Sequence, residues 1–272
     1  MKRRSFLTQT CWITGGTFLA VACRPKAENS TISEASLPVL RMATSADYPP
    51  YEFIDPNTDA NDIIGFDVDV ATHITQQLGY QLEVVNINFD ALFPALQTAQ
   101  ADFAMAGIHP SEERQEILDF SDIYYAANYV IMSDVKLDIR EFEDLADRRI
   151  GVTMGSIEEG ILQDRTSDID DLEIIQKDNH TDLITGLRTG ELDGVMLEQV
   201  VAQTLSEQYR GLHLSKPLPR PEPVDVAIAF PQGSKLIDNF NQIIATMNDD
   251  GTMIQLIQKW FGTDNNDESD QA

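Results

Sequence analysis

An internal repeat limits the folds that this chain can adopt. Residues 92–107 (LFPALQTAQADFAMAG) align without gaps with residues 183–198 (LITGLRTGELDGVMLE), and five of the aligned positions are identical. Each copy has the pattern of an apolar-faced helix, a tight turn and an apolar strand. Convergence of two helix–turn–strand units would produce a similar match. Either origin predicts an α/β protein with two lobes.

The repeat also predicts where a ligand would bind. The two expected strands end at Gly107 and Glu198. Ligands of open α/β sheets bind beyond the carboxyl ends of the strands. We therefore expect these two residues to face one cleft from opposite walls.

Apolar periodicity predicts further elements on both sides of the repeat. Val39 to Ala43 is a short apolar run, and apolar residues recur every four positions from 66 to 78, with Gly79 as the stop of an amphipathic helix. Residues 236–247 carry the strongest helical stripe, Gly251 fits its C-terminus, and a short final helix follows.

The first 23 residues have the pattern of an export signal. A basic start at residues 2–4 precedes a short apolar region that ends at Cys23. Residues 20–22 match an A-x-A cleavage site, and residues 19–23 also resemble a lipobox in which Cys23 becomes lipidated; both interpretations cut the same bond. The pair at 3–4 resembles a twin-arginine signal, although an ordinary secretory signal fits as well.

Several segments flank the expected folded part. Residues 24–37, rich in Ser, Thr, Glu, Asn and Pro, are typical of a tether, and residues 264–272 form an acidic tail. No segment after the signal approaches 18 apolar residues, so we expect no membrane span there.

The charge balance excludes one class of partner. The chain has 45 Asp and Glu against 19 Lys and Arg, which gives a formal net charge of −26. Such a surface repels phosphate backbones, so we expect no nucleic-acid binding. Two cysteines cannot build a disulfide framework, and the four histidines show no metal-ligand spacing. We therefore expect no metal and no cofactor.

Two helix starts carry chemistry that could bind an anion. Ser111 fits an N-cap, which places Arg114 at the third helical position, where the helix dipole disfavours a cation. Its partner is either a neighbouring glutamate on the surface or the carboxylate of a ligand. Ser156 and Glu159 match a capping box, whose helix start is either a plain cap or an anion site.

A set of motifs then runs in order through residues 38–263. They are YPPYEF at 48–53, GFDVDV at 65–70, FDAL at 89–92, ER at 113–114 followed by DFSD at 119–122, GT at 251–252 and KWFG at 259–262. In this order and spacing the chain resembles the bacterial extracellular solute-binding proteins for polar amino acids.

The resemblance implies a fold and a function. The fold would be the α/β periplasmic-binding-protein fold of type II, with two lobes, two hinge strands and the ligand in the cleft between them. Lobe 1 would comprise residues 38–127 and 226–263 and lobe 2 residues 128–225, linked near 128–133 and 224–230. The protein would be a periplasmic monomer, not an enzyme, that delivers an amino acid to the membrane permease of an ABC importer.

The resemblance also implies roles for single residues. Arg114 would hold the ligand's α-carboxylate, and Glu198 would take the α-ammonium group, with one methylene more than the family's usual Asp. The remaining implied contacts are Ser156 and the Ile157 amide to the carboxylate, the Gly107 backbone, and Tyr48 and Phe89 on either side of the ligand's side chain.

The sequence departs from the family pattern at several positions. His109 stands where the family usually has Ser or Thr, Ile157 where it usually has Thr, and Thr75 where it prefers a small residue. Ser45 stands where some binders of basic amino acids carry Asp, and Asp47 is a candidate replacement for that carboxylate. These departures bear on the choice of ligand.

We expect the ligand to be a basic amino acid, arginine first. Tyr48 and Phe89 would offer two aromatic faces to a guanidinium, and the acidic chain would draw cations. A glutamine-type binder is the alternative. An exported dehydratase on the same scaffold, with Glu198 or His109 as acid or base, is a further one, as is the sensing domain of a receptor. We interpret the acid pairs Asp67/Asp69 and Glu158/Glu159 as solvated faces or helix caps.

Overall fold

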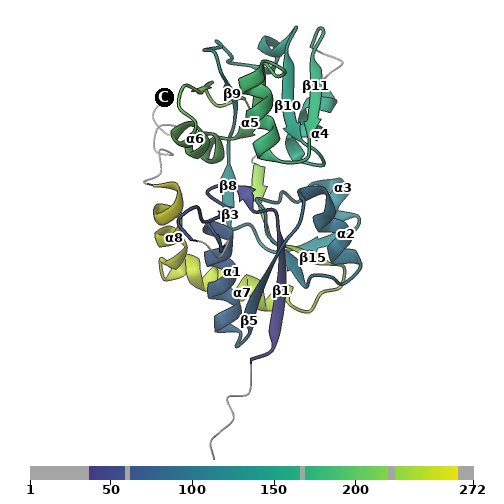
Figure 1. Ribbon diagram of the computed structural model, residues 1–272. Helices are drawn as coiled ribbons and strands as arrows, with labels where there is room; N and C mark the ends of the chain where they lie inside the picture. Colours follow the sequence, from purple (N-terminus) through teal and green to yellow (C-terminus); the bar gives the residue numbers. More distant parts are fainter. Residues whose placement is uncertain (1–36, 59–61, 166–168, 220–223, 263–272) are drawn as a thin grey trace, which may run out of the picture. The chain divides into compact units, whose positions relative to one another are not determined.

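The computed structural model describes residues 37–58, 62–165, 169–219 and 224–262 (Figure 1). The predicted export signal, Cys23, nearly all of the tether and the acidic tail lie outside these ranges. Within them, no helix combines the length and the apolar character that crossing a membrane would require.

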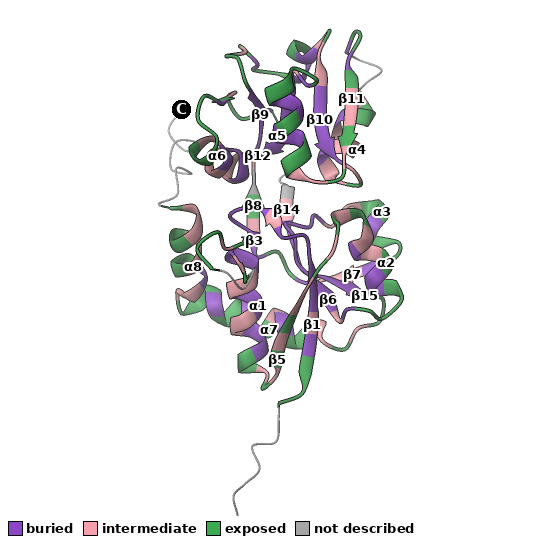
Figure 2. Ribbon diagram, viewed as in Figure 1, coloured by how far each residue is buried: buried purple, intermediate pink, exposed green. Residues whose placement is uncertain are grey.

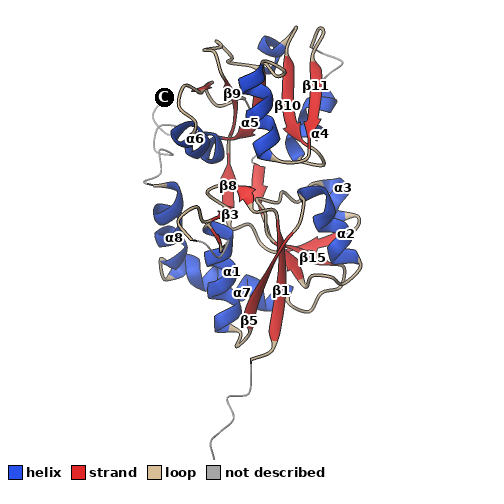
Figure 3. Ribbon diagram, viewed as in Figure 1, coloured by secondary structure: helices blue, strands red, loops and turns tan. Residues whose placement is uncertain are grey.

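The first of two five-stranded sheets in the described residues has the strand order β5-β1-β6-β15-β7. Figure 3 shows the strands in red. β1 pairs in parallel with β5 and β6, whereas β15 pairs antiparallel with β6 and β7. We call this sheet and the helices packed on it lobe 1. Its strands are β1 (Val39–Thr44), β5 (Gln81–Asn86), β6 (Phe103–Ala104), β7 (Leu118–Phe120) and β15 (Ala229–Pro231).

The second sheet repeats the pattern of the first, with the order β11-β10-β12-β9-β13. β10 pairs in parallel with β11 and β12, and β9 pairs antiparallel with β12 and β13. This sheet and its helices form lobe 2. Its strands are β9 (Tyr129–Ser133), β10 (Arg149–Thr153), β11 (Glu173–Lys177), β12 (Gly194–Glu198) and β13 (His213–Leu214).

The predicted helix–turn–strand repeat is present in both lobes. In lobe 1, α2 (Leu92–Gln97) leads to β6, and in lobe 2, α5 (His180–Thr189) leads to β12. The turns match as well, because Ala99 has φ of 56° and its aligned partner Gly190 has φ of 74°. A left-handed conformation is costly for alanine, so the turn geometry is retained even where the sequence has lost the glycine.

The same side-chain contact ties the repeat to each sheet. In lobe 1, the backbone N–H of Arg41 donates to Asp102 Oδ2 at 2.7 Å. In lobe 2, the backbone N–H of Arg149 donates to Asp193 Oδ2 at 2.9 Å. Each arginine also donates from Nη2 to a carbonyl oxygen of the left-handed turn just before the aspartate, that of Ala99 in lobe 1 and that of Gly190 in lobe 2. The aligned aspartates therefore hold each turn against the second strand of its sheet, β1 in lobe 1 and β10 in lobe 2.

The long helices lie where the periodicity predicts them. α1 (Phe66–Gln77) ends one residue earlier than expected, and Gly79 adopts φ of 74° beyond its end. α7 (Ile237–Asp249) and α8 (Thr252–Phe261) meet at Gly251, which has φ of 81°. These three helices pack on one another at lobe 1. Figure 2 shows their buried stripes facing inwards and exposed residues outside.

Two short strands connect the lobes along the chain. β8 (Tyr125–Ala127) and β14 (Val224–Val226) pair antiparallel as a separate two-stranded sheet. The first connection, β8, therefore begins three residues before the expected segment 128–133. Residues 129–133 of that segment form β9 of the second sheet. The second connection begins at the expected residue 224.

A small sheet and shorter helices complete the described residues. β2 (Asp47–Tyr48), β3 (Glu52–Ile54) and β4 (Ile63–Ile64) form an antiparallel sheet that directly follows β1. The remaining helices are α3 (Glu112–Gln115), α4 (Ile157–Arg165), α6 (Gln199–Gln208) and the 3₁₀ turns at Phe89–Ala91 and Phe142–Leu145.

Candidate ligand-binding site

A cavity lies at the carboxyl ends of β1, β6, β10 and β12. It is partly open to solvent, and its empty space, open solvent included, is about 450 Å³. All nine residues that the resemblance implied line it: Asp47, Tyr48, Phe89, Gly107, His109, Arg114, Ser156, Ile157 and Glu198. The sequence reasoning missed seven other lining residues: Glu52, Ala106, Thr153, Glu158, His180, Met196 and Leu197.

Gly107 and Glu198 face the same cavity, as the repeat predicts. β12 ends at Glu198, but β6 ends at Ala104, so the expectation that the first strand reaches Gly107 was wrong. Gly107 lies in the loop after β6 with φ of 57°. A Cβ there would lie 2.9 Å from Tyr48 Cε1 and 3.5 Å from Glu198 Oε1. Only glycine leaves this part of the cavity open.

Arg114 is buried at the edge of the cavity, with an exposed fraction of 7%. Ser111 caps α3 by accepting a hydrogen bond from the Arg114 backbone N–H. The guanidinium donates from Nη1 to the His109 carbonyl oxygen at 2.8 Å and from Nη2 to the Gly155 carbonyl oxygen at 2.9 Å. Its Cζ atom lies 4.9 Å from the ring centre of Phe93.

The surroundings of Arg114 leave its charge available. Burial lowers the pKa of Arg114, while the charge of Glu158 opposes that shift. The neighbouring Glu112, Glu113 and Glu116 are exposed, and none of them forms an ion pair with it among the described residues. The alternative of a surface ion pair is therefore wrong. Guanidinium carries five N–H donors, so donors remain for a carboxylate.

Glu198 is fully buried and already has two partners. Tyr51 donates its hydroxyl to Glu198 Oε2 at 2.7 Å. His109 Nε2 lies 2.9 Å from Glu198 Oε1. Both partners come from lobe 1, whereas Glu198 ends a strand of lobe 2, so these contacts join the lobes in the structure.

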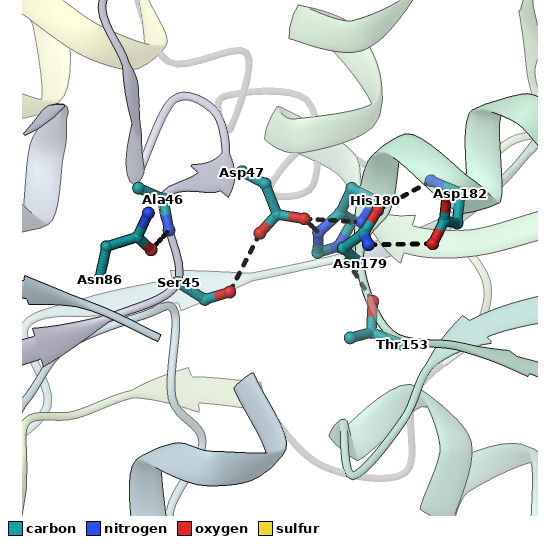
Figure 4. A network of polar contacts seen from close by, with 8 residues as sticks. All are labelled: Ser45, Ala46, Asp47, Asn86, Thr153, Asn179, His180 and Asp182. Atoms are coloured by element: carbon teal, nitrogen blue, oxygen red, sulfur yellow. Dashed lines mark hydrogen bonds and ion pairs between the residues drawn. The ribbon is translucent and has the colours of Figure 1, made fainter. Parts of the chain in front are cut away.

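A second polar network joins the lobes at Asp47 (Figure 4). Its Oδ1 accepts from the Ser45 hydroxyl at 3.1 Å, and its Oδ2 accepts from the His180 backbone N–H at 2.7 Å. His180 is the first residue of α5, and its ring nitrogen Nε2 lies 3.3 Å from Thr153 Oγ1. Burial alone would raise the pKa of Asp47, but the hydrogen bonds and charge of His180 lower it overall. Asp47 therefore places a carboxylate on a helix N-terminus of the other lobe.

Tyr48 packs between two rings at the cavity wall. Its ring is stacked on Tyr51 with centroids 5.6 Å apart and lies 4.4 Å from the ring of His180. Phe89 instead contacts Phe93, with centroids 6.0 Å apart. The two aromatic residues implied to flank the ligand thus both line the cavity, and His180 adds a third ring that no sequence pattern predicts.

The start of α4 combines a cap with an acid in the cavity. Ser156 Oγ accepts from the Glu159 backbone N–H at 3.2 Å, as a capping box requires. Glu159 Oε2, however, accepts from the Gly155 N–H at 2.8 Å and not from that of Ser156. The serine half of the capping box is therefore confirmed, and the glutamate half is not. Glu158 is buried in the first turn of α4, so its interpretation as part of a solvated face was wrong. Burial raises its pKa.

Asp67 was also misread from the sequence. It is fully buried, its Oδ1 accepts from the Tyr124 hydroxyl at 2.7 Å, and its Oδ2 accepts from the Gly107 N–H at 3.1 Å. Asp67 thus fixes the loop that carries Gly107. Burial raises the pKa of Asp67 to about 7, and burial together with the charge of Asp67 raises the pKa of Glu52 well above its usual range.

The fold and this cavity define a class of protein: a two-lobed α/β binding protein with its site between two similar sheets. The described residues contain no group of His, Cys, Asp and Glu arranged to hold a metal ion. The profile of the bacterial extracellular solute-binding proteins, family 3, matches residues 40–263. The chain belongs to this family of extracellular solute-binding proteins, and the relatives it matches are substrate-binding proteins of ABC transporters.

Individual relatives cover nearly the whole chain. The arginine-binding extracellular protein ArtP of Bacillus subtilis (strain 168) is 32% identical over 90% of this chain and 93% of its own length. An ancestral arginine-binding protein bound to arginine has a TM-score of 0.76 and 32% identity, covering 82% of this chain and 98% of that one. A structure described as an ancestral arginine-binding protein bound to glutamine has a TM-score of 0.75 and 31% identity, with the same coverage.

Proposed function

We propose that this protein binds a basic amino acid, arginine first, in the cavity between its lobes and delivers it to the permease of an ABC importer. The proposal extends the family's general function, capture of an amino acid for import, to one class of ligand. The names of the similar arginine-binding proteins support it.

The charge of the cavity carries the proposal. Four carboxyl side chains line it, and Arg114 is the only arginine or lysine among the lining residues. Burial, together with the charges of Asp67 and Asp47, raises the pKa of Glu52 well above its usual range. The zwitterionic part of an amino acid brings one positive and one negative group, which leaves the excess of acid in place. A cationic side chain offsets that excess, because a buried charge is stable only when it is paired.

Single residues take the roles that the family pattern implies. Arg114 binds the α-carboxylate together with the Ser156 hydroxyl and the Ile157 amide. Glu198 accepts from the α-ammonium group, and the loop at Gly107 approaches the ligand's main chain.

The side chain of the ligand then lies against the aromatic wall. Tyr48 and Phe89 contact its apolar length, and a guanidinium stacks well on such rings. Glu158 and Asp47 supply carboxylates for its charged end. Asp47 can do so only in part, because its Oδ2 already accepts from the N-terminus of α5.

A polar neutral ligand such as glutamine is the second candidate. Ser45 lacks the carboxylate that some binders of basic amino acids have at this position, and the Ser45 hydroxyl is directed to Asp47 at 3.1 Å. The glutamine complex of an ancestral arginine-binding protein, similar in fold and 31% identical, favours this candidate independently.

A thermal-shift screen of the twenty amino acids tests the choice of ligand. A ligand at one hundred times its Kd stabilises the folded state by about 2.7 kcal/mol. For a folded part of this size that corresponds to a rise in Tm of roughly 5–11 °C. We expect this rise with arginine. Stabilisation by glutamine or glutamate, with none by arginine, lysine or histidine, would overturn the proposal.

The remaining proposals concern the protein in the cell. We propose that residues 38–127 with 226–263 and residues 128–225 move as two lobes that close on the ligand. The protein acts as a monomer, exported through the signal at residues 1–23 and anchored through a lipid on Cys23. Mass spectrometry of the protein from membranes tests the anchor: a simple cleavage product without lipid would contradict it.

A further inference from the structure

His109 connects three separate segments of the chain at the cavity. It lies in the loop after β6 and has an exposed fraction of 5%. Its Nδ1 is 3.0 Å from the carbonyl oxygen of Asp225, which belongs to the connecting strand β14. Its Nε2 is 2.9 Å from Oε1 of Glu198, at the end of β12. The ring therefore has a fixed partner on each nitrogen.

These two partners determine where the protons are. A carbonyl oxygen only accepts hydrogen bonds, so Nδ1 of His109 carries a hydrogen. A carboxylate oxygen also only accepts, so the contact between Nε2 and Glu198 Oε1 needs one more proton between the two atoms. With that proton the pair is either imidazolium and carboxylate or imidazole and carboxylic acid. In both forms the net charge of the pair is zero.

Other charged groups face this pair from several elements. Glu158 of α4, Arg114 of α3 and the ring of Tyr129 in β9 lie around His109. Of the atoms of His109, Arg114 contacts the backbone carbonyl oxygen, to which its Nη1 donates. In the proposed function this arginine serves the ligand's carboxylate.

The groups around Glu198 add no fixed compensating charge. Tyr51 donates to its Oε2, and the rings of Tyr48 and Tyr51 pack beside it. Behind them are Glu52 and Asp67, and burial raises the pKa of both carboxyls.

An arriving ammonium group thus meets a pair whose charges are already balanced. If the shared proton stayed, the ammonium would add an uncompensated positive charge at a fully buried carboxylate. If the proton leaves, His109 Nε2 and Glu198 Oε1 become two acceptors 2.9 Å apart, which the ammonium can satisfy with two of its three N–H donors. The charge of the site then stays balanced.

We propose that an amino acid displaces the proton held between His109 and Glu198, its ammonium group taking the place of that proton. The step forms N–H···N and N–H···O hydrogen bonds to the ligand, breaks the one between the pair, and transfers one proton to the solvent buffer. It rests on the proposed function, because Glu198 must receive the ammonium group. His109 is then the residue that couples ligand binding to pH.

Calorimetry in buffers of different ionisation enthalpy tests the coupling. Arginine is titrated into the protein at pH 7 in phosphate, HEPES and Tris, and glutamine serves as a second probe. When a proton is released, the apparent binding enthalpy changes linearly with the ionisation enthalpy of the buffer. We expect the slope to correspond to about one proton released, and the affinity to increase when the pH is raised, because binding releases a proton.

Two variants identify the source of the proton. His109→Ser introduces the hydroxyl that the family usually has and leaves the backbone carbonyl that accepts from Arg114. We expect arginine to bind this variant with no dependence of the heat on buffer. His213→Ser is the matched control, because His213 is exposed on β13, away from the cavity, and we expect it to retain the slope.

The outcomes separate this inference from the proposed function. Binding of arginine or glutamine with the same heat in every buffer would overturn the proton displacement and leave the function intact. A slope that persists in His109→Ser would assign the proton to Glu158 or Asp67 and also overturn it. Failure of both amino acids to bind would overturn the proposed function, and the coupling with it.

Discussion

Replacing Arg114 is the most direct test of the site, because this residue spans its two halves. In the structure, its Nη1 and Nη2 donate to carbonyl oxygens on either side of the cavity, at 2.8 and 2.9 Å. The flat guanidinium is also held against Phe93. It is therefore ordered before any ligand arrives, so little side-chain entropy is lost when it grips a carboxylate.

The expected size of the effect follows from this burial. Arg114 is 7% exposed, so solvent screens its charge little. Arg114→Ala leaves the ligand's carboxylate without its cation, and breaking a buried charged pair costs about 2–5 kcal/mol. That corresponds to a loss of affinity of roughly 30- to 5,000-fold. Arg114→Lys keeps the charge but loses one of two parallel hydrogen bonds, which costs about 1.5–3 kcal/mol.

Isothermal titration with the amino acid that stabilises the protein most measures these affinities. We expect the order wild type, then Arg114→Lys, then Arg114→Ala, with Arg114→Lys at least about tenfold weaker than the wild type. Glu113→Gln changes the charge at the exposed neighbouring position and is the matched control, with an effect below twofold. The Tm of each ligand-free variant checks its folding. An Arg114→Ala protein that folds normally and binds within twofold of the wild type would refute the role.

Three further changes probe the rest of the cavity. Gly107→Ala forces a Cβ to 2.9 Å from Tyr48 in a left-handed conformation. We expect weaker binding and a lower Tm, because backbone strain alone lowers the free energy of unfolding by about 1–2 kcal/mol. Unchanged calorimetric affinity would show that the cavity tolerates a side chain there. Glu158→Gln should weaken arginine binding at least about tenfold, the effect of one charged hydrogen bond, yet leave glutamine within about threefold, and equal losses for both ligands would contradict a role in charge recognition. The pKa of Glu52 is raised in the folded state, so between its unfolded pKa near 4 and the higher folded value the native state binds more protons than the unfolded state and loses stability as pH rises. Glu52→Gln removes that loss, so in urea unfolding the variant should gain stability relative to the wild type as the pH is raised from 4 to 8. A constant difference across that range would argue against a raised pKa of Glu52.

The elements that were predicted well are those fixed by local periodicity. The stripes of α1 and α7 and the glycines beyond their ends are encoded within a dozen residues, and the structure has both helices within two residues of the predicted bounds. The helix–turn–strand repeat was found in the same way. The connecting strand at 125–127 was misplaced because a strand of three residues carries no usable period.

The missed residues depend on contacts between distant segments. His180 lies 133 positions from Asp47, and nothing near it in the sequence indicates that Asp47 reaches the start of its helix. Glu158 follows a serine N-cap, a place where acids are common for purely local reasons. Asp67 lies in the first turn of α1, where an acid is also common because it interacts favourably with the helix dipole. Burial separates these acids from ordinary caps, and burial is a property of the assembled lobes.

The two copies of the repeat contribute different groups to the cavity from the same backbone geometry. Equivalent strand orders in the two sheets, and aspartates that accept from β1 and β10 in the same way, favour duplication over convergence. Each copy ends at the cavity, yet one supplies Gly107, which has no side chain, and the other supplies the carboxylate of Glu198. In the closed arrangement a Cβ on the first would be 3.5 Å from the oxygen of the second. The space for the charged main chain of a ligand therefore exists because the last aligned position is Gly107 in one copy and Glu198 in the other, while the two copies share the same backbone fold.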